Sequence, residues 1–157
     1  MADRKENYHA VMASPWGMLG IVADDAVRGI DFLSPRVSAR APTTTLARAC
    51  LRQLTAYFRD PTWRFDLPLV LTGTAYQQRV WRVLQTIPMG KVLCYGDVAR
   101  RLRSGARAVG GACGANPVPI IVPCHRVVAS NGLGGFSGGR VAHATDIKQW
   151  LLRHEGA

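Results

Sequence analysis

The N-terminal part of the chain alternates short apolar runs with polar turn signals. Residues 8–13, 18–23 and 27–32 are apolar and rich in β-branched and aromatic side chains, and they are separated by Ser14-Pro15-Trp16-Gly17 and Asp24-Asp25. Such runs are typical of strands joined by tight turns. The pattern therefore predicts a small antiparallel sheet at the start of the chain.

A polar linker, residues 34–42, leads to a segment with helical periodicity. The apolar positions recur every three or four residues, which predicts an amphipathic helix over 45–58; they are Leu46, Cys50, Leu54 and Tyr57. One of the threonines at 43–45 can cap this helix, and Asp60-Pro61 ends it. Residues 63–71 are a candidate further strand. This half carries no recognisable chemistry, and we interpret it as a scaffold.

The second half of the chain is predominantly helical in its apolar spacing. Val80, Val83, Leu84 and Ile87 predict a helix over 75–86, which Pro88-Met89-Gly90 ends. Two short helices are predicted next, over 96–102 and 106–114, with Ser104-Gly105 as the turn between them. Two short helices joined by a tight glycine-containing turn indicate a helix-turn-helix.

The second of these short helices is rich in glycine and alanine. Glycine costs roughly 1 kcal/mol in a helix interior relative to alanine, so three of them imply a need for a slim surface. That surface could admit another molecule, or it could allow close helix–helix packing inside the protein, and the glycines alone favour neither. Arg107, which projects from this helix, favours DNA.

These elements predict an α/β (α+β) protein with two domains. Residues 1–70 form a small antiparallel sheet with a helix, a scaffold. Residues 71–157 form a mainly helical domain that contains the helix-turn-helix and Cys124.

The distribution of charge adds a candidate partner. The net charge is +10; residues 1–70 hold nine basic and seven acidic side chains, whereas residues 71–157 hold eleven basic and three acidic ones. A one-sided basic surface indicates a polyanion, with nucleic acid first, although a solubility bias gives the same excess.

The sequence also indicates in which cellular compartment the protein is expected. No apolar run approaches the roughly 20 residues of a membrane span. The N-terminus, residues 1–8, is polar and has no signal-peptide pattern. We expect a cytoplasmic protein that does not bind a membrane, with free thiols. The four cysteines form no CxxC pair and no zinc spacing, so no metal is expected, and Cys50, Cys94 and Cys113 are interpreted as apolar fillers.

The segment around Cys124 carries the candidate chemistry. An apolar, strand-like run at 120–122 ends at Pro123, and Cys124-His125 follows directly. A thiol becomes a strong nucleophile as the thiolate, and a nearby histidine can accept its proton directly or through water. A buried cysteine beside a surface histidine would give the same dipeptide. The glycine-dense loop 132–139, with Phe136 for stacking on a base, favours a pocket for a flat heterocycle instead.

The motifs along the second half resemble the O6-alkylguanine-DNA alkyltransferase family, also called methylated-DNA–protein-cysteine methyltransferases. The resemblance spans residues 73–156 and rests on motifs in a fixed order. They read Gly73-Thr74-Ala75-Tyr76-Gln77, Val80-Trp81, Ile87-Pro88-Met89-Gly90, Tyr95-Gly96, Arg107-Ala108-Val109-Gly110, Asn116-Pro117, Pro123-Cys124-His125-Arg126-Val127 and Leu151-Leu152-Arg153-His154-Glu155-Gly156.

The resemblance implies a catalytic group of five residues. Cys124 would be the alkyl acceptor, His125 its water-mediated base, and Glu155 the carboxylate that orients His125. Asn116 would brace the turn before the active-site strand, and Tyr95 would donate a proton to the leaving guanine and press on the target phosphate.

The resemblance also implies a DNA surface and a base pocket. Arg107 would enter the duplex and fill the gap left by the flipped nucleotide, because paired guanine keeps its O6 out of reach of a buried thiol. The residues implied for DNA binding are Arg107, Ala108, Tyr95 and Arg126, and those implied for the base pocket are Val127, Phe136, Ser137 and Gly138.

The implied activity is a one-shot repair reaction. The alkyl group, methyl above all, would pass from O6-alkylguanine, and also from O4-alkylthymine, in double-stranded DNA to Cys124. The thioether is stable and nothing regenerates the thiol, so each molecule acts once, without a cofactor. The resemblance implies a monomer, associated with the nucleoid if the source is bacterial.

Three departures and three alternatives accompany this resemblance. The segment between Tyr95 and Arg107 is slightly short, Phe136 replaces a common tyrosine, and residues 140–146 look like an insertion before the last helix. An alkyltransferase-like binding protein would lack the acceptor cysteine. A helix-turn-helix regulator would not need the Pro123-Cys124-His125-Arg126 motif, and a Cys-His hydrolase would not explain Arg107.

Overall fold

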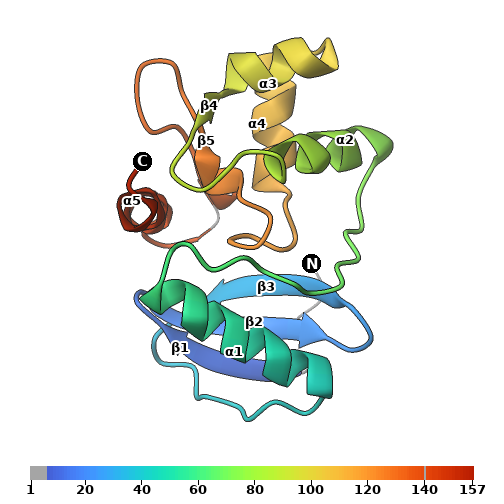
Figure 1. The fold of residues 1–157 in the computed structure, drawn as a ribbon, viewed down its shortest axis with the longest axis vertical. Coiled ribbons are helices and arrows are strands. Elements are labelled where there is room, and N and C mark those ends of the chain that lie inside the picture. The colour runs from blue at the N-terminus through green and yellow to red at the C-terminus, as the bar shows by residue number, and fades with distance from the viewer. Residues whose placement is uncertain (1–6, 140) are drawn as a thin grey trace. The chain divides into compact units, whose positions relative to one another are not determined.

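The computed structural model describes residues 7–139 and 141–157, which divide into two compact units, Met1–Leu71 and Thr72–Ala157. Residues 1–6 of the polar N-terminal segment, and Arg140 of the predicted insertion, lie outside the described residues. Figure 1 shows the elements of both units in chain order. No helix in the described part of the chain is long and apolar enough to span a membrane.

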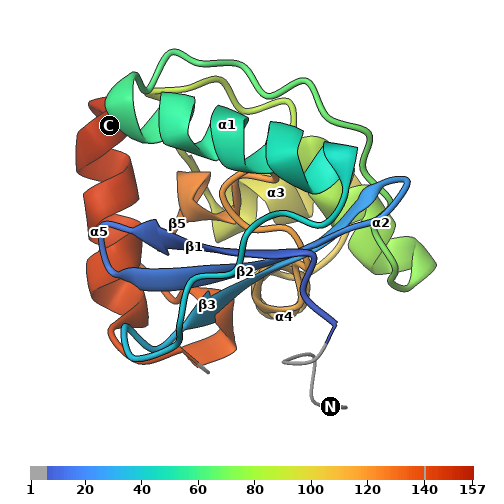
Figure 2. The same ribbon diagram turned by 90° about the horizontal axis from the view of Figure 1, so that it is seen from below.

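The first unit is a three-stranded antiparallel sheet covered by one helix. The strands β1 (Ala10–Ser14), β2 (Gly17–Ala23) and β3 (Val27–Leu33) lie in the order β1-β2-β3. The helix α1 (Thr45–Arg59) lies across one face of this sheet, as Figure 2 shows. The predicted mixed α/β class is thus confirmed, because the alternating and helical apolar patterns meet in one core that contains Leu19, Ile21, Cys50 and Leu54.

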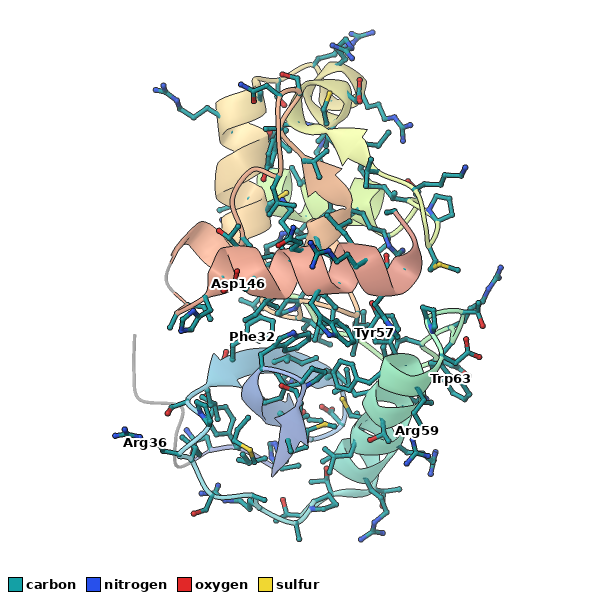
Figure 3. All side chains as sticks on the ribbon, turned by 90° about the vertical axis from the view of Figure 1, so that its left-hand side faces the viewer. Phe32, Arg36, Tyr57, Arg59, Trp63 and Asp146 are labelled. Atoms are coloured by element: carbon teal, nitrogen blue, oxygen red, sulfur yellow. The ribbon has the colours of Figure 1, made fainter. Side chains whose placement is uncertain are left out.

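A side-chain hydrogen bond fixes where α1 begins, and two arginines of this unit are exposed to solvent. The Thr44 hydroxyl accepts a hydrogen bond from the Ala47 backbone N–H, which satisfies a donor that the first helical turn leaves open. Arg36 and Arg59 are exposed and project outward from the unit (Figure 3).

The strand predicted over 63–71 is wrong. In the described chain this stretch makes one isolated bridge, in which Val27 N–H donates to the Pro68 carbonyl and Val70 N–H donates to the Val27 carbonyl. Pro68 has no N–H to extend a ladder. The backbone of Asp66 instead forms two hydrogen bonds with the Gln53 side chain: its N–H donates to Gln53 Oε1 at 2.8 Å, and its carbonyl accepts from Gln53 Nε2 at 3.0 Å.

The second unit is mainly helical. Its helices are α2 (Ala75–Leu84), α3 (Tyr95–Leu102), α4 (Ala106–Gly114) and α5 (Ala144–Glu155). The short strands β4 (Leu93–Cys94) and β5 (Val127–Val128) pair in parallel, and two 3-10 turns, η2 (Cys124–Arg126) and η3 (Ser137–Gly139), complete it. The sequence predicted α2 two residues too long, and placed residues 144–146 in an insertion although they begin α5.

The helices α2, α3 and α4 pack around a small apolar core. Trp81 on α2 is almost fully buried, and its indole N–H donates to the Ala112 carbonyl of α4 at 2.9 Å. The predicted helix-turn-helix corresponds to α3 and α4, with Arg103 in the left-handed region (φ 53°) at the turn between them. An arginine in that conformation is uncommon, and it lets the chain reverse within three residues.

The glycines of α4 serve both purposes that the sequence left open. Gly111 is exposed, and a Cβ placed there would meet no atom within 4 Å, so this face of the helix is free for another molecule. Gly114 faces inward, where a Cβ would lie 3.0 Å from the Gly138 Cα. Close approach inside the protein and a slim outer face therefore occur on one helix.

Candidate active site

A tight turn, and not a strand, delivers Cys124. The predicted strand-like run at 120–122 is wrong: Ile120 lies in the left-handed region at φ 76°, and Val122 N–H donates to the Val118 carbonyl. The Asn116 side chain closes this turn, because its amide donates to the Val122 carbonyl at 2.8 Å and its oxygen accepts from Val118 N–H at 3.0 Å.

The turn stores strain that its surroundings compensate. A β-branched residue in the left-handed region costs about 1–3 kcal/mol. Ile120 and Val122 are both buried, so apolar burial offsets that cost and holds the turn in place. Pro123 follows, and Cys124 then opens η2 with its side chain almost fully buried.

His125 is held by a buried carboxylate from α5. Its Nε2 lies 3.0 Å from Glu155 Oε2, and both side chains have no exposed area. Arg126 donates two hydrogen bonds of 2.9 Å to the same carboxylate, from Nε to Oε1 and from Nη2 to Oε2. Its third contact is a bond of 2.7 Å from Nη1 to the Ile87 carbonyl.

The carboxylate fixes which nitrogen of His125 carries the proton. Burial alone would raise the pKa of Glu155, but the hydrogen bonds from His125 and Arg126 lower it to about 2, so the group is ionised at neutral pH. An ionised carboxylate only accepts, so Nε2 must be the protonated nitrogen. Nδ1 then carries the lone pair, and within the described residues it has no hydrogen-bond partner. His125 is therefore arranged to accept a proton at Nδ1.

Burial also sets the resting states of the thiol and the imidazole. It raises the pKa of Cys124, although the Asn116 side chain and the positive charge of Lys148 act in the opposite direction. It lowers the pKa of His125, although Glu155 acts in the opposite direction. Cys124 thus rests as a thiol beside a neutral imidazole, and a base must remove its proton before it can attack.

Lys148 is a site residue that the sequence reasoning missed. Its side chain on α5 has no exposed area, and its ammonium donates to the Val127 carbonyl at 2.6 Å and to the Gly135 carbonyl at 2.8 Å. It also lies 3.5 Å from the Tyr95 hydroxyl. Burial lowers the pKa of Lys148 to about 8. Ile147, Lys148, Leu151, Leu152 and Glu155 form the buried face of α5, and that spacing could have identified a lysine pointing inward.

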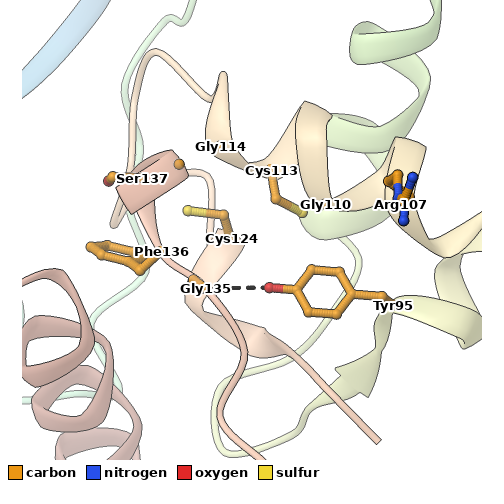
Figure 4. Close-up of a pocket in the computed structure, with 10 residues that line it drawn as sticks. Tyr95, Arg107, Gly110, Cys113, Gly114, Cys124, Gly135, Phe136 and Ser137 are labelled. Carbon is orange, nitrogen blue, oxygen red and sulfur yellow. Dashed lines mark hydrogen bonds between the residues drawn. The ribbon is translucent and has the colours of Figure 1, made fainter. Parts of the chain in front are cut away.

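The thiol opens onto a pocket of about 280 Å³. One wall is α4, which contributes Arg107, Gly110, Cys113 and Gly114, and the other is the loop from Gly135 to Gly138. Figure 4 shows Cys124 between these walls, with the Tyr95 ring on one side and Phe136 on the other. Burial raises the pKa of Tyr95, so its phenol keeps a proton that it can donate.

Most of the predicted site residues gather around this pocket. Tyr95, Arg107, Cys124, Phe136, Ser137 and Gly138 line it. Ala108 lies beside Arg107 on the exposed face of α4. Val127 is buried, and its carbonyl is engaged by Lys148.

Arg126 differs from its predicted role. It was expected to bind DNA, but its guanidinium points inward, with 14% of the side chain exposed, and holds Glu155 and the Ile87 carbonyl. A buried carboxylate requires a charged partner, and Arg126 supplies it. We therefore assign Arg126 to the positioning of Glu155.

Comparisons with known proteins extend over nearly the whole chain. Residues 75–157 match the family model "6-O-methylguanine DNA methyltransferase, DNA binding domain". A methylated-DNA–protein-cysteine methyltransferase of Methanosarcina acetivorans is 36% identical, over 96% of this chain and 99% of that protein. One from Mycolicibacterium paratuberculosis is 40% identical, over 90% of this chain and 88% of that protein.

Solved structures agree with these relatives. The crystal structure of Mycobacterium tuberculosis O6-methylguanine methyltransferase has a TM-score of 0.80 and 34% identity, and covers 94% of this chain and 92% of its own. A structure of Mycobacterium tuberculosis OGT in complex with DNA has a TM-score of 0.79 and 37% identity, and covers 93% of this chain and 91% of its own.

Proposed function

The chain belongs to the methylated-DNA–protein-cysteine methyltransferase family, and from that premise we propose that Cys124 receives the alkyl group. The observation that carries this assignment is the position of its thiol, between the pocket walls and next to the His125–Glu155 pair. Cys113 also lines the pocket, but burial raises its pKa to about 12 and no base adjoins it in the chain. Among the four cysteines, all of them in the described part of the chain, only Cys124 combines access to the pocket with a neighbouring base.

The reaction begins with activation of the thiol. His125 Nδ1 accepts the Cys124 proton, directly or through one water, and Glu155 stabilises the imidazolium that forms. The thiolate then attacks the alkyl carbon on guanine O6. A sulfur–carbon bond forms as the carbon–oxygen bond breaks, and the electron pair of that bond leaves with the guanine.

Tyr95 supplies a proton to the departing guanine. Its hydroxyl lies at the pocket beside the Lys148 ammonium, which stabilises the phenolate that remains. The thioether product is stable, so one molecule repairs one base. Phe136 and Ser137 face the flipped base, which Phe136 contacts by stacking and Ser137 by a hydrogen bond.

DNA reaches the pocket along α4. Arg107 and Ala108 lie on its exposed face, and Arg107 also lines the pocket, so one side chain can enter the duplex above the thiol. The unit carries eight more positive than negative side chains, counted over residues 71–157, which supports salt-sensitive binding to phosphates. We propose that the ligand is double-stranded DNA carrying O6-alkylguanine, and that O4-alkylthymine is a second substrate.

The protein is proposed to act as a monomer where the DNA lies, in the cytoplasm and at the nucleoid in a bacterium. The acceptor, the base, the carboxylate and the exposed face of α4 all belong to one unit of one chain, which supports this state.

Intact-protein mass tests the function. After incubation with a duplex containing O6-methylguanine, the protein should gain the mass of one CH₂ and no more, because a methyl group replaces the thiol hydrogen, and the Cys124→Ser variant should gain none. If the unmodified chain binds the duplex tightly without any change of mass, it is a binding protein and the proposed transfer is wrong.

A further inference from the structure

The two walls of the pocket touch each other at two glycines. A Cβ added to Gly114, on α4, would lie 3.0 Å from the Cα and 3.1 Å from the N of Gly138, in the loop. Contacts of 3.0–3.4 Å are tighter than nine in ten real Cβ contacts, so the loop backbone would have to move by a few tenths of an ångström. Both residues line the pocket, so the backbones of α4 and the loop meet beside Cys124.

The loop is fixed elsewhere, which leaves this contact to set its position. Gly135 accepts a bond of 2.8 Å from Lys148, and a Cβ on Gly134 would lie 2.8 Å from the Tyr95 ring. At the other end, three consecutive residues adopt left-handed conformations: Ser137 (φ 51°), Gly138 (φ 63°) and Gly139 (φ 71°). These conformations form a tight turn at Gly138, and the contact with Gly114 limits how close that turn can come to α4.

We propose that the absence of a side chain at Gly114 sets the width of the pocket, and so the size of the alkyl group that Cys124 accepts. This inference rests on the proposed function. A methyl group is held against the thiol because the walls approach to backbone contact. A Cβ at this position displaces the turn outward, which loosens the fit of a methyl group and makes room for a bulky one.

A displacement of the turn by a few tenths of an ångström is sufficient to change the ratio of the benzyl to the methyl transfer rate measurably. One methylene in an apolar pocket changes discrimination between substrates by roughly 10- to 200-fold. We expect the Gly114→Ala variant to raise the ratio of the benzyl to the methyl transfer rate by roughly threefold or more, as a partial effect of that kind.

The experiment compares two duplexes, one with O6-methylguanine and one with O6-benzylguanine, in single-turnover reactions followed by intact mass. Gly132→Ala is the control, because Gly132 lies outside α4 and outside the pocket lining, and its Cβ meets nothing within 4 Å. It should keep the ratio of the unmodified chain. Duplex affinity, measured with each glycine variant in a Cys124→Ser background, should be unchanged in both.

A second variant changes the same wall without touching the loop. Gly110 lines the pocket, and its added Cβ would be 3.9 Å from the Tyr95 ring, an ordinary contact. Gly110→Ala therefore fills space and should lower the benzyl-to-methyl ratio, a result that remains available if Gly114→Ala does not fold.

The outcomes separate this inference from the function on which it rests. If the unmodified chain gains no alkyl mass from either duplex, the proposed function fails. If it does react, and Gly114→Ala slows both transfers equally, the contact is merely structural and the inference is overturned. An unchanged ratio in Gly110→Ala, with Gly114→Ala unfolded, overturns it as well.

Discussion

Replacing Glu155 by glutamine should reverse the proton arrangement of His125. The glutamine oxygen can accept from Arg126, which directs its NH₂ group toward His125 Nε2, 3.0 Å away in the native pair. Nε2 must then be the acceptor, so the proton moves to Nδ1 and that nitrogen can no longer take the proton of Cys124. The change preserves size and shape, so the loss is one of proton placement.

The magnitude follows from the chemistry and from the burial. A comparable change to the wrong tautomer costs about 10⁴-fold in a catalytic triad, and we expect methyl transfer at pH 7 to slow by about 10²- to 10⁴-fold. Arg126 also loses its buried carboxylate, so the free energy of unfolding should fall by about 3–5 kcal/mol.

Single-turnover transfer with excess methylated duplex measures the rate, and urea unfolding measures the stability. Asp146→Asn is the matched control, since it removes the same charge from an exposed position of the same helix. The deficit of Glu155→Gln should shrink as pH rises, because hydroxide then removes the thiol proton without His125. A folded Glu155→Gln protein that transfers methyl within twofold of the native rate would refute the assignment of His125 as the base.

Three further outcomes are expected. The carboxyl of Glu155 has a pKa of about 2 in the fold against 4.5 ordinarily, so its stabilisation, about 3 kcal/mol, is present above pH 4.5 and lost as pH falls toward 2; urea unfolding between pH 6 and 3 should show this loss in the native chain and not in Glu155→Gln. The pKa of Lys148 is lowered from 10.5 to about 8, so the unfolded chain binds more protons between these values and stability should rise there with pH. Lys148→Met should abolish that rise and slow transfer at least tenfold by releasing Tyr95 and the Gly135 carbonyl; an unchanged pH dependence would exclude burial of the ammonium. Arg107→Ala should slow transfer from the duplex while transfer from the free base O6-benzylguanine stays within twofold, as intact mass would show; an equal loss with both substrates would mean that Arg107 acts in the pocket and not on DNA.

The sequence predicted those parts of the fold that local periodicity controls. The apolar spacing of α1 and α2 placed both helices within two residues, because one face of each is buried and the other is not. The predicted family is confirmed by the family-model match over residues 75–157 and by the relative that is 36% identical over 96% of this chain. The boundary residues of elements depend on single hydrogen bonds, which periodicity does not report.

The structure differs from the sequence interpretation where single side-chain hydrogen bonds decide the outcome. The apolar residues 120–122 read as a strand, but the amide of Asn116 closes them into a turn. Arg126 read as a DNA contact, but a carboxylate 29 positions further along the chain draws it inward. Lys148 carried no motif, and its role emerges only where α5 brings it to the carbonyls of Val127 and Gly135.

The buried indole of Trp81 gives the protein an internal fluorescent probe. Its N–H bond to Ala112 ends on the helix that carries Arg107 and forms one wall of the pocket. Emission from an indole depends on its hydrogen bond and on the polarity around it. In a chain whose Trp16, Trp63 and Trp150 are replaced by phenylalanine, movement of α4 on duplex binding would become visible in real time as a change in emission, before any bond to Cys124 has formed.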